Sequence, residues 1–244
     1  MPPIRDQTIL VIGGSSGIGY GVADRCLAEG AKVVIASSNL PHVQQSVSKL
    51  QQKYPDANIS GQGCDLSPAC VEENLKKLFE SVTPLDHIVY TAGDPLSIMP
   101  IPQINLGAVH KAGHVRFAVP LLLSKFAQRH LKPTYQSSLT LTSGAGGDKP
   151  FPGWSLVAGY LSGLQGVTRN LALDLQPLRV NLVSPGAVET PLHGPGGVPD
   201  EMKAHTTLGK AGLPEEVAEA YLYFMKDTNA TGSCIDTNGG SFLV

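Results

Sequence analysis

Short runs of β-branched and aliphatic residues alternate along the chain with longer stretches that repeat at helical spacing. Five of the short runs end in Gly or Ser, as buried parallel strands often do, at residues 8–14, 31–37, 86–93, 137–144 and 178–186. Between them, apolar positions recur every three or four residues at residues 19–30, 43–54, 115–131 and 161–176. This alternation predicts an α/β fold, a doubly wound parallel sheet with helices on both faces.

No linker, internal repeat or low-complexity block interrupts the pattern, so residues 1–244 are predicted to form a single domain. The least regular stretch is residues 190–213, which is rich in Gly, Pro and His. It is longer than an ordinary connection between elements, which predicts a substrate lid; disorder is the alternative.

The composition excludes several classes of function. A net charge of −2 at pH 7 gives no electrostatic case for binding nucleic acid or an anionic membrane. The four cysteines are scattered, without a CxxC pair or a zinc-like spacing, so we expect reduced thiols and no metal. The chain has no signal pattern at its start and no apolar run near the ~20 residues of a membrane span, so we expect a cytoplasmic protein.

The segment VIGGSSGIGYG follows the first predicted strand directly and opens the first predicted helix. Its glycine spacing allows the backbone to turn tightly and to approach a pyrophosphate, while the helix N-terminus supplies free N–H groups and a partial positive charge. In the first strand–helix unit, this motif predicts a dinucleotide site. The contacts predicted from this loop are Gly13, Ser15, Ser16, Gly17, Ile18 and Gly19.

The end of the second predicted strand bears on which dinucleotide is bound. An NAD site usually carries a carboxylate here for the ribose 2′-hydroxyl, whereas this chain has Ser37, Ser38 and Asn39. No acid would repel a 2′-phosphate, and two hydroxyls and an amide could donate to it. The segment therefore favours NADP(H); NAD stays open because no arginine is present there.

With the glycine loop GGSSGIG, five further segments resemble the short-chain dehydrogenase/reductase family, over essentially the whole chain. They are CDLS, YTAG (where Asn-Asn-Ala-Gly is usual), LTSGAGG, VNLVSPGAVETP and CIDTNGGSFLV. The resemblance implies a single-domain Rossmann fold with a nicotinamide cofactor. The further cofactor contacts that it implies are Asp65, Leu66, Thr91, Ala92, Gly93, Pro185, Gly186, Val188 and Thr190.

The catalytic positions depart from this resemblance. The family carries Tyr-x-x-x-Lys at the start of the helix that runs into GVTRNLALDL, and counting back from Gly166 places those positions at Val157 and Leu161. The family's catalytic serine maps to Ser143. Its helix asparagine maps to Arg116, with an alignment through Asn105 as the alternative. The usual proton donor and its lysine are therefore missing.

Two residues are candidates to replace the missing groups. Tyr160 lies three positions past Val157, about 60° around the helix, and could reach the cleft from a flank; packing is the alternative. Arg116 cannot donate a proton at ordinary pH, because its pKa exceeds ~12, but it can stabilise a developing anion. We predict Arg116, Ser143 and Tyr160 as the catalytic set. The substrate pocket is predicted to contain Trp154, Phe151 and His193.

Hydride delivery to an iminium ion creates a neutral amine and needs no proton donor. The segments PFPGWSLVAGYLSGL and VRFAVPLLLSK resemble a fungal branch of the family that lacks the Tyr–Lys pair and includes reductase/Diels–Alderases of secondary metabolism. That branch has an aspartate where this chain has Phe151. The interpretation is an NADP-dependent reductase of an iminium, conjugated or carbonyl group in a bulky metabolite, assembled as a homodimer or homotetramer. A non-redox cyclase or isomerase and a cofactor-binding pseudoenzyme are the alternatives.

Overall fold

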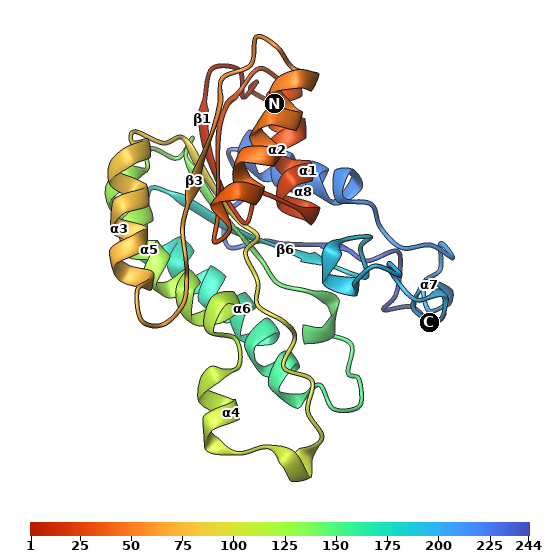
Figure 1. Ribbon diagram of the computed structural model, residues 1–244. Helices are drawn as coiled ribbons and strands as arrows, with labels where there is room; N and C mark the ends of the chain where they lie inside the picture. Colours follow the sequence, from red (N-terminus) through yellow and green to blue (C-terminus); the bar gives the residue numbers. More distant parts are fainter.

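The computed structural model covers residues 1–244 and builds seven parallel strands into one sheet (Figure 1). The strands are β1 (Thr8–Ile12), β2 (Lys32–Ser37), β3 (Ile59–Gly63), β4 (His87–Tyr90), β5 (Ser138–Thr142), β6 (Arg179–Pro185) and β7 (Cys234–Thr237). Their order across the sheet is β3-β2-β1-β4-β5-β6-β7. The chain thus winds outward from β1, then returns to β4 and winds the other way. The loops after β1 and β4 diverge at this reversal, which opens a crevice at the carboxyl ends of the strands.

Helices cover both faces of the sheet, as the sequence pattern predicts (Figure 1). One face carries α1 (Gly17–Ala28), α2 (Leu40–Lys53) and α8 (Pro214–Lys226), whose apolar sides form one buried cluster with β1 and β2. The other face carries α3 (Val71–Val82), α5 (Val119–His130) and α6 (Ser155–Asp174), with a second cluster. The predicted single-domain Rossmann fold is confirmed.

Besides the short helices at Leu106–Lys111 and Asp200–Ala204, the structure contains three elements that the sequence pattern did not predict: β3, α3 and α8. The strand β3 reads ISGQG and has one large apolar residue, because it lies at the edge of the sheet and pairs with β2 alone. A hydrophobic run could not have revealed it. The helix α3 does repeat apolar positions at helical spacing, with Leu75, Leu78 and Phe79 buried, so its pattern was available in the sequence.

The stretch 115–131, predicted as one helix, begins instead with a wide turn. Residues His114–Ala118 form the π-helical segment η2, and α5 follows at Val119. Gly113 has φ +71°, and its carbonyl accepts from the N–H of Ala118, five residues on, at 3.2 Å. Insertions of this kind often occur at functional sites. Here the turn carries Arg116 beside the segment that follows β4.

The remaining short elements lie at the rim of the molecule. The helix α4 (Leu106–Lys111) and the 3-10 turn η1 (Ile101–Gln103) form an excursion between β4 and α5, at the bottom of Figure 1. The turn η3 (Ala145–Gly147) follows β5. The stretch predicted as a lid contains the turn η4 (Pro191–His193) and α7 (Asp200–Ala204). None of the helices combines the length and apolar character that crossing a bilayer needs.

Candidate active site

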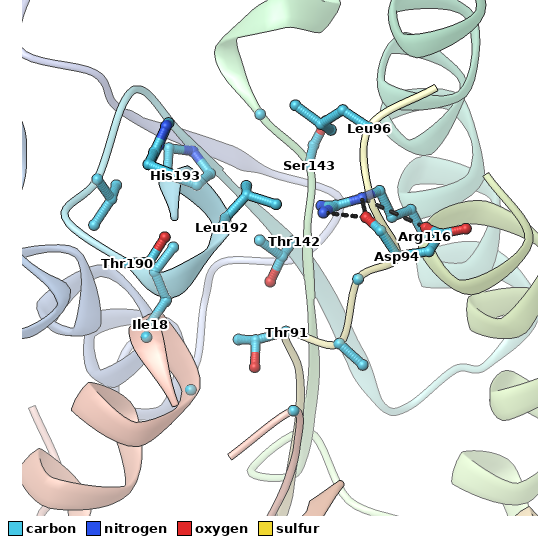
Figure 2. Close-up of a pocket in the computed structure, with 18 of the residues that line it drawn as sticks. Ile18, Thr91, Asp94, Leu96, Arg116, Thr142, Ser143, Thr190, Leu192 and His193 are labelled. Carbon is cyan, nitrogen blue, oxygen red and sulfur yellow. Dashed lines mark hydrogen bonds and ion pairs between the residues drawn. The ribbon is translucent and has the colours of Figure 1, made fainter. Parts of the chain in front are cut away.

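A cleft of about 980 Å³ opens at the carboxyl ends of the strands, between β1 and β4, where the order of the strands along the sheet reverses. Figure 2 shows Thr91 after β4 and Thr142 at the end of β5 at its centre, with Ile18 of α1 and Thr190 on one side and Arg116 on the other. Parallel strands bring their carboxyl ends to one edge, which explains why motifs far apart in the sequence meet here.

The glycines of the first loop are required by its packing. Gly13 has φ +93°, and a Cβ there would lie 2.5 Å from the main-chain nitrogen of Ala92. A Cβ on Gly19 would lie 2.3 Å from the carbonyl oxygen of Gly13. The loop is thus pressed against the end of β4. Gly17, with φ +51°, adopts a conformation that favours glycine where α1 begins.

The N-terminus of α1 fits an anion. Its N-cap residue, Ser16, makes no side-chain cap, and the first turn holds no acidic residue. The first N–H groups of a helix have no intrahelical acceptor and carry partial positive charge. Gly17 and Ile18 line the cleft at this point, so the residues present suit the pyrophosphate of a dinucleotide.

At the end of β2, Ser37 and Ser38 line the cleft and Asn39 does not. The side-chain oxygen of Asn39 accepts from the N–H of His42 at 3.0 Å, which makes it the N-cap of α2. Its predicted role as a cofactor contact is therefore not supported by its position, since a capping asparagine faces its own helix. No carboxylate from this segment enters the cleft.

Beside this segment, Asp65 and Leu66 line the cleft as predicted, because β3 pairs with β2 and the N–H of Cys64 donates to the carbonyl of Ser37 at 2.8 Å. The Asp65 carboxylate accepts from the N–H of Ser67 at 2.9 Å and from its hydroxyl at 3.0 Å. These bonds lower the pKa of Asp65, the main-chain bond most strongly, so the group stays ionised and fixed in orientation.

The other predicted cofactor residues also meet in the cleft. The segment after β4 contributes one side and the segment after β6 the other (Figure 2). Residues from these two segments that line it are Thr91, Ala92, Gly93, Pro185, Gly186, Val188 and Thr190. Gly186 is tightly placed, because a Cβ there would lie 2.8 Å from the Cα of Asn238.

Arg116 enters the cleft from η2 and is held by the segment after β4. Its Nε and Nη2 donate to the main-chain carbonyl of Asp94 at 2.9 and 2.7 Å, and its Nε lies 3.5 Å from the Asp94 Oδ1. The guanidinium covers Gly93, where a Cβ would lie 2.5 Å from its Cζ. Figure 2 shows it between Asp94 and Ser143. The structure therefore brings a fixed cation to the cleft, as the sequence predicts.

Beside Arg116, the floor of the cleft is formed by Ser143, Leu161 and, behind them, Val157. Val157 and Leu161 are aliphatic, and the motif resemblance places the family's tyrosine and lysine at these two positions. Leu161 lines the cleft, while Val157 is fully buried behind it and does not. Ser143 also lines the cleft, and its hydroxyl donates to the main-chain carbonyl of Leu161 at 2.9 Å. The proton of Ser143 is therefore directed at α6, and only its oxygen is left to accept a bond from a ligand.

Tyr160 does not reach the cleft. It belongs to a small buried cluster with Val157 and Leu161, and its ring lies over Gly113, where a Cβ would lie 2.7 Å from its Cγ. Burial raises the pKa of its hydroxyl. The structure thus places Tyr160 on the flank of α6 that packs against the start of η2, which corresponds to the packing alternative and not to its predicted catalytic role.

The predicted pocket residues form an apolar wall. Phe151 and Trp154 pack with ring centroids 5.0 Å apart at an interplanar angle of 48°, and both line the cleft. Leu192 and His193 of η4 also line the cleft, across from Arg116 and Asp94 (Figure 2). Burial lowers the pKa of His193, which keeps its ring neutral near pH 7. A bulky apolar ligand would lie against these residues.

Sequence reasoning missed several residues of the substrate end. They are Asp94, Leu96, Lys149, Glu201 and Met202. Asp94 directly follows the YTAG segment, so its position after that motif was the available signal. Met202 and His205 lie in and just after α7, within the predicted lid, which therefore borders the cleft. The lid itself stays a prediction.

Comparison with known proteins agrees with the motif resemblance. A family model described as "SDR-like rossmann domain" matches residues 3–244. Short-chain dehydrogenase/reductase ATR9 of Stachybotrys chlorohalonatus is 43% identical over 256 residues, covering all of both chains. The predicted family membership is thereby confirmed.

Two solved structures are informative about the cleft. The MalC reductase/Diels-Alderase from Malbranchea aurantiaca has a TM-score of 0.92 at 38% identity, covering 99% of this chain and 98% of that one. A small-chain dehydrogenase in complex with NADPH has a TM-score of 0.80 at 27% identity, covering 98% of this chain and 100% of that one. Both are similar to this chain over its full length.

Proposed function

The chain belongs to the short-chain dehydrogenase/reductase family, and we propose that it is an NADP(H)-dependent reductase of an iminium or conjugated carbonyl group in a bulky secondary metabolite. When bound, the nicotinamide nucleotide supplies or accepts a hydride. The uncapped start of α1 and the glycine loop would hold its pyrophosphate. The NADPH complex of a related dehydrogenase supports the same assignment.

One observation carries the choice of substrate: the cleft floor offers no proton donor where the family has one. Val157 and Leu161 are buried aliphatic residues, and the hydroxyl proton of Ser143 is taken by the carbonyl of Leu161. Reduction of a neutral ketone leaves an alkoxide that must be protonated, and general acid catalysis contributes roughly 10²–10⁴-fold. Reduction of an iminium leaves a neutral amine, which needs no proton.

The remaining groups would position the substrate. Arg116 is pinned at the edge of the floor and would stabilise negative charge that develops on a conjugated carbonyl oxygen. The Phe151–Trp154 pair would pack against the apolar body of the substrate, and Leu192 with Met202 would cover it from the lid side. Closure of these surfaces would exclude water from the reacting atoms.

The choice of NADP(H) rests on the end of β2. Ser37 and Ser38 line the cleft there, and neither they nor any neighbour in that segment presents a carboxylate that would repel a 2′-phosphate. Hydroxyl groups can donate hydrogen bonds to phosphate oxygens.

A second function, cyclisation without redox chemistry, is favoured by the shape of the substrate end. The aromatic pair Phe151 and Trp154 and the lid residue Leu192 line the same cleft, which would hold a flexible apolar molecule in a folded conformation. MalC of Malbranchea aurantiaca, to which this chain is similar, is a reductase/Diels-Alderase.

The test supplies NADPH with N-benzyl-3,4-dihydroisoquinolinium, a bulky cyclic iminium, and in parallel with 2-benzyl-1-tetralone, a ketone of similar size. We expect oxidation of NADPH with the iminium and at least about a hundredfold less with the ketone, given the contribution of a general acid. Equal rates with both substrates would contradict the inference that the floor of the cleft lacks a proton donor. Binding of NADPH without turnover of any substrate would favour the pseudoenzyme, and cyclisation that ignores the nicotinamide oxidation state would favour the cyclase.

A further inference from the structure

We propose that Asp94 binds the positively charged group of the substrate and thereby makes the cleft selective for cations. The inference rests on the proposed function, since it names the charge of the substrate that the same site would take. It concerns a residue that the motifs do not single out, and it follows from how the carboxylate of Asp94 is placed.

Asp94 lies beside the reacting end of the cleft. It follows Gly93, which carries the guanidinium of Arg116 above it, and its side chain is 25% exposed. Figure 2 shows Asp94 and Arg116 together on one side of the cleft, across from Leu192 and His193. A substrate group placed above Gly93 would therefore touch this pair.

The carboxylate of Asp94 has no hydrogen-bond donor within the chain. Its Oδ1 is buried and accepts no hydrogen bond. Two of the five N–H donors of Arg116, on Nε and Nη2, bind the main-chain carbonyl of Asp94, and none makes a hydrogen bond to its carboxylate. At 3.5 Å from Oδ1, the Arg116 Nε is an ion-pair neighbour without a hydrogen bond. Because Oδ1 is closed off from the cleft, a ligand would reach this partly exposed carboxylate through Oδ2, which has no donor in the chain either.

The charges around Asp94 also suit a cation. At longer range its charge cancels that of Arg116, so the pair does not repel a positive substrate on approach. The nearby cation Lys149 donates to the carbonyls of Ser241 and Val244. At contact, Oδ2 of Asp94 is the anionic acceptor at this end of the cleft, and an iminium or ammonium group matches it.

The experiment compares two ligands of one shape and different charge. Isothermal titration calorimetry, with NADP⁺ present and no turnover, measures the binding of N-benzyl-3,4-dihydroisoquinolinium and of its uncharged carbon isostere, 3-benzyl-1,2-dihydronaphthalene. In Asp94→Asn, which keeps the shape and the main-chain carbonyl, we expect the iminium to bind about tenfold more weakly or worse, because a charge-assisted contact is lost. The isostere should bind within about twofold of the unaltered protein, which also shows that the cleft is intact.

Two further variants separate charge from structure. Asp94→Glu retains the charge and should recover part of the iminium affinity. Asp174→Asn makes the same charge change at the exposed end of α6, away from the cleft, and should change neither affinity. The inference is overturned if Asp94→Asn weakens both ligands equally, leaves the iminium unaffected, or tightens its binding. Selective binding without NADPH oxidation would sink the proposed reductase and leave the role of Asp94 standing.

Discussion

The hydroxyl of Ser143 donates a hydrogen bond of 2.9 Å to the main-chain carbonyl of Leu161. By the motif resemblance, these two residues are predicted to correspond to the catalytic serine and lysine of the family to which the chain belongs. Here the serine is bonded to the backbone of α6, and the side chain of Leu161 covers the space where an ammonium would stand. This contact also directs the hydroxyl proton of Ser143 away from the cleft, in addition to the aliphatic residues Val157 and Leu161 at the predicted positions of the proton donor and its lysine.

Restoring the tyrosine should damage the fold instead of restoring ketone reduction. Val157 is fully buried in a cluster with Tyr160 and Leu161. We expect Val157→Tyr to lower the free energy of unfolding by about 1–3 kcal/mol, because an aromatic ring overfills this space. Urea denaturation measures it. The matched variant Ser155→Tyr, exposed on the same helix, should change stability by less than about 0.5 kcal/mol; equal losses would contradict the assignment.

A methyl group on Gly93 should displace the guanidinium of Arg116. The added Cβ would lie 2.5 Å from its Cζ, and the long side chain can move aside without unfolding the protein. We expect Gly93→Ala to keep its melting temperature and to lose about tenfold or more in kcat/KM. The comparison is Gly144→Ala, whose Cβ would make ordinary contacts of 3.6 Å with Leu161 and 3.7 Å with Pro185. A similar loss in both variants would remove the role of Arg116.

A carboxylate at the end of β2 should reverse the preference between nucleotides. Ser38 is exposed and lines the cleft, so Ser38→Asp would place a negative charge where the 2′-phosphate of NADPH is proposed to bind. We expect affinity for NADPH to fall by about tenfold or more, while affinity for NADH is kept or gained. Titration with both nucleotides measures this. Ser38→Asn, of similar size without charge, is the control; equal losses for NADPH and NADH would argue against the assignment.

The free energy of unfolding should decrease as the pH falls, because of a buried histidine far from the cleft. His87 lies between Ser138 and Gln7, with both ring nitrogens 2.8 Å from their partners, and burial lowers its pKa from 6.5 to about 3. The unfolded chain therefore binds this proton first, so stability is present above about pH 6.5 and is lost as the pH falls towards 3. We expect about 1.4 kcal/mol lost per pH unit in this window, relative to His87→Gln.

Denaturant unfolding at several pH values, above the range where carboxylates titrate, isolates this effect. His110→Gln, at an exposed position on α4, serves as the matched histidine variant and should follow the unaltered protein. If His87→Gln and the unaltered protein lost stability in parallel between about pH 6.5 and pH 5, the assignment to His87 would be wrong.

The outer face of α6 should pair with a second copy of the chain. Gly159, Gly166 and Leu173 recur every seven residues on this helix; a Cβ on either glycine would meet nothing within 4 Å, and Leu173 is 64% exposed. Residues spaced by seven share one face of a helix, and small ones permit close approach. We expect a homodimer or homotetramer by light scattering, and Gly166→Arg should reduce the mass.

The control for that variant is Ser48→Arg, on the exposed side of α2, which should keep the assembly intact. A mass of 25.6 kDa for the unaltered protein, that of one chain, would refute the prediction.

The sequence by itself determined the fold class, the central strands of the sheet and the nucleotide end of the cleft, but not the edge strand β3. Strand and helix periods are local properties, and the glycine loop needs particular backbone conformations that few other residues adopt. The loss of the catalytic pair was equally local, because Val157 and Leu161 could be counted from Gly166. The sequence was less able to show which side of a helix a residue faces. Tyr160 and Leu161 are neighbours in sequence, yet only Leu161 lines the cleft.

Only the tertiary structure decided which groups meet at the substrate end. In the folded chain, Asn39 caps a helix and the hydroxyl of Ser143 donates to a carbonyl 18 residues away. The guanidinium of Arg116 donates to the main-chain carbonyl of Asp94, 22 residues before it. Such contacts depend on the packing of α6 and η2 against the ends of the strands, which no period along the chain encodes. A carboxylate without a donor is visible only when every neighbour has its place, and for that reason Asp94 could not have been found from the sequence.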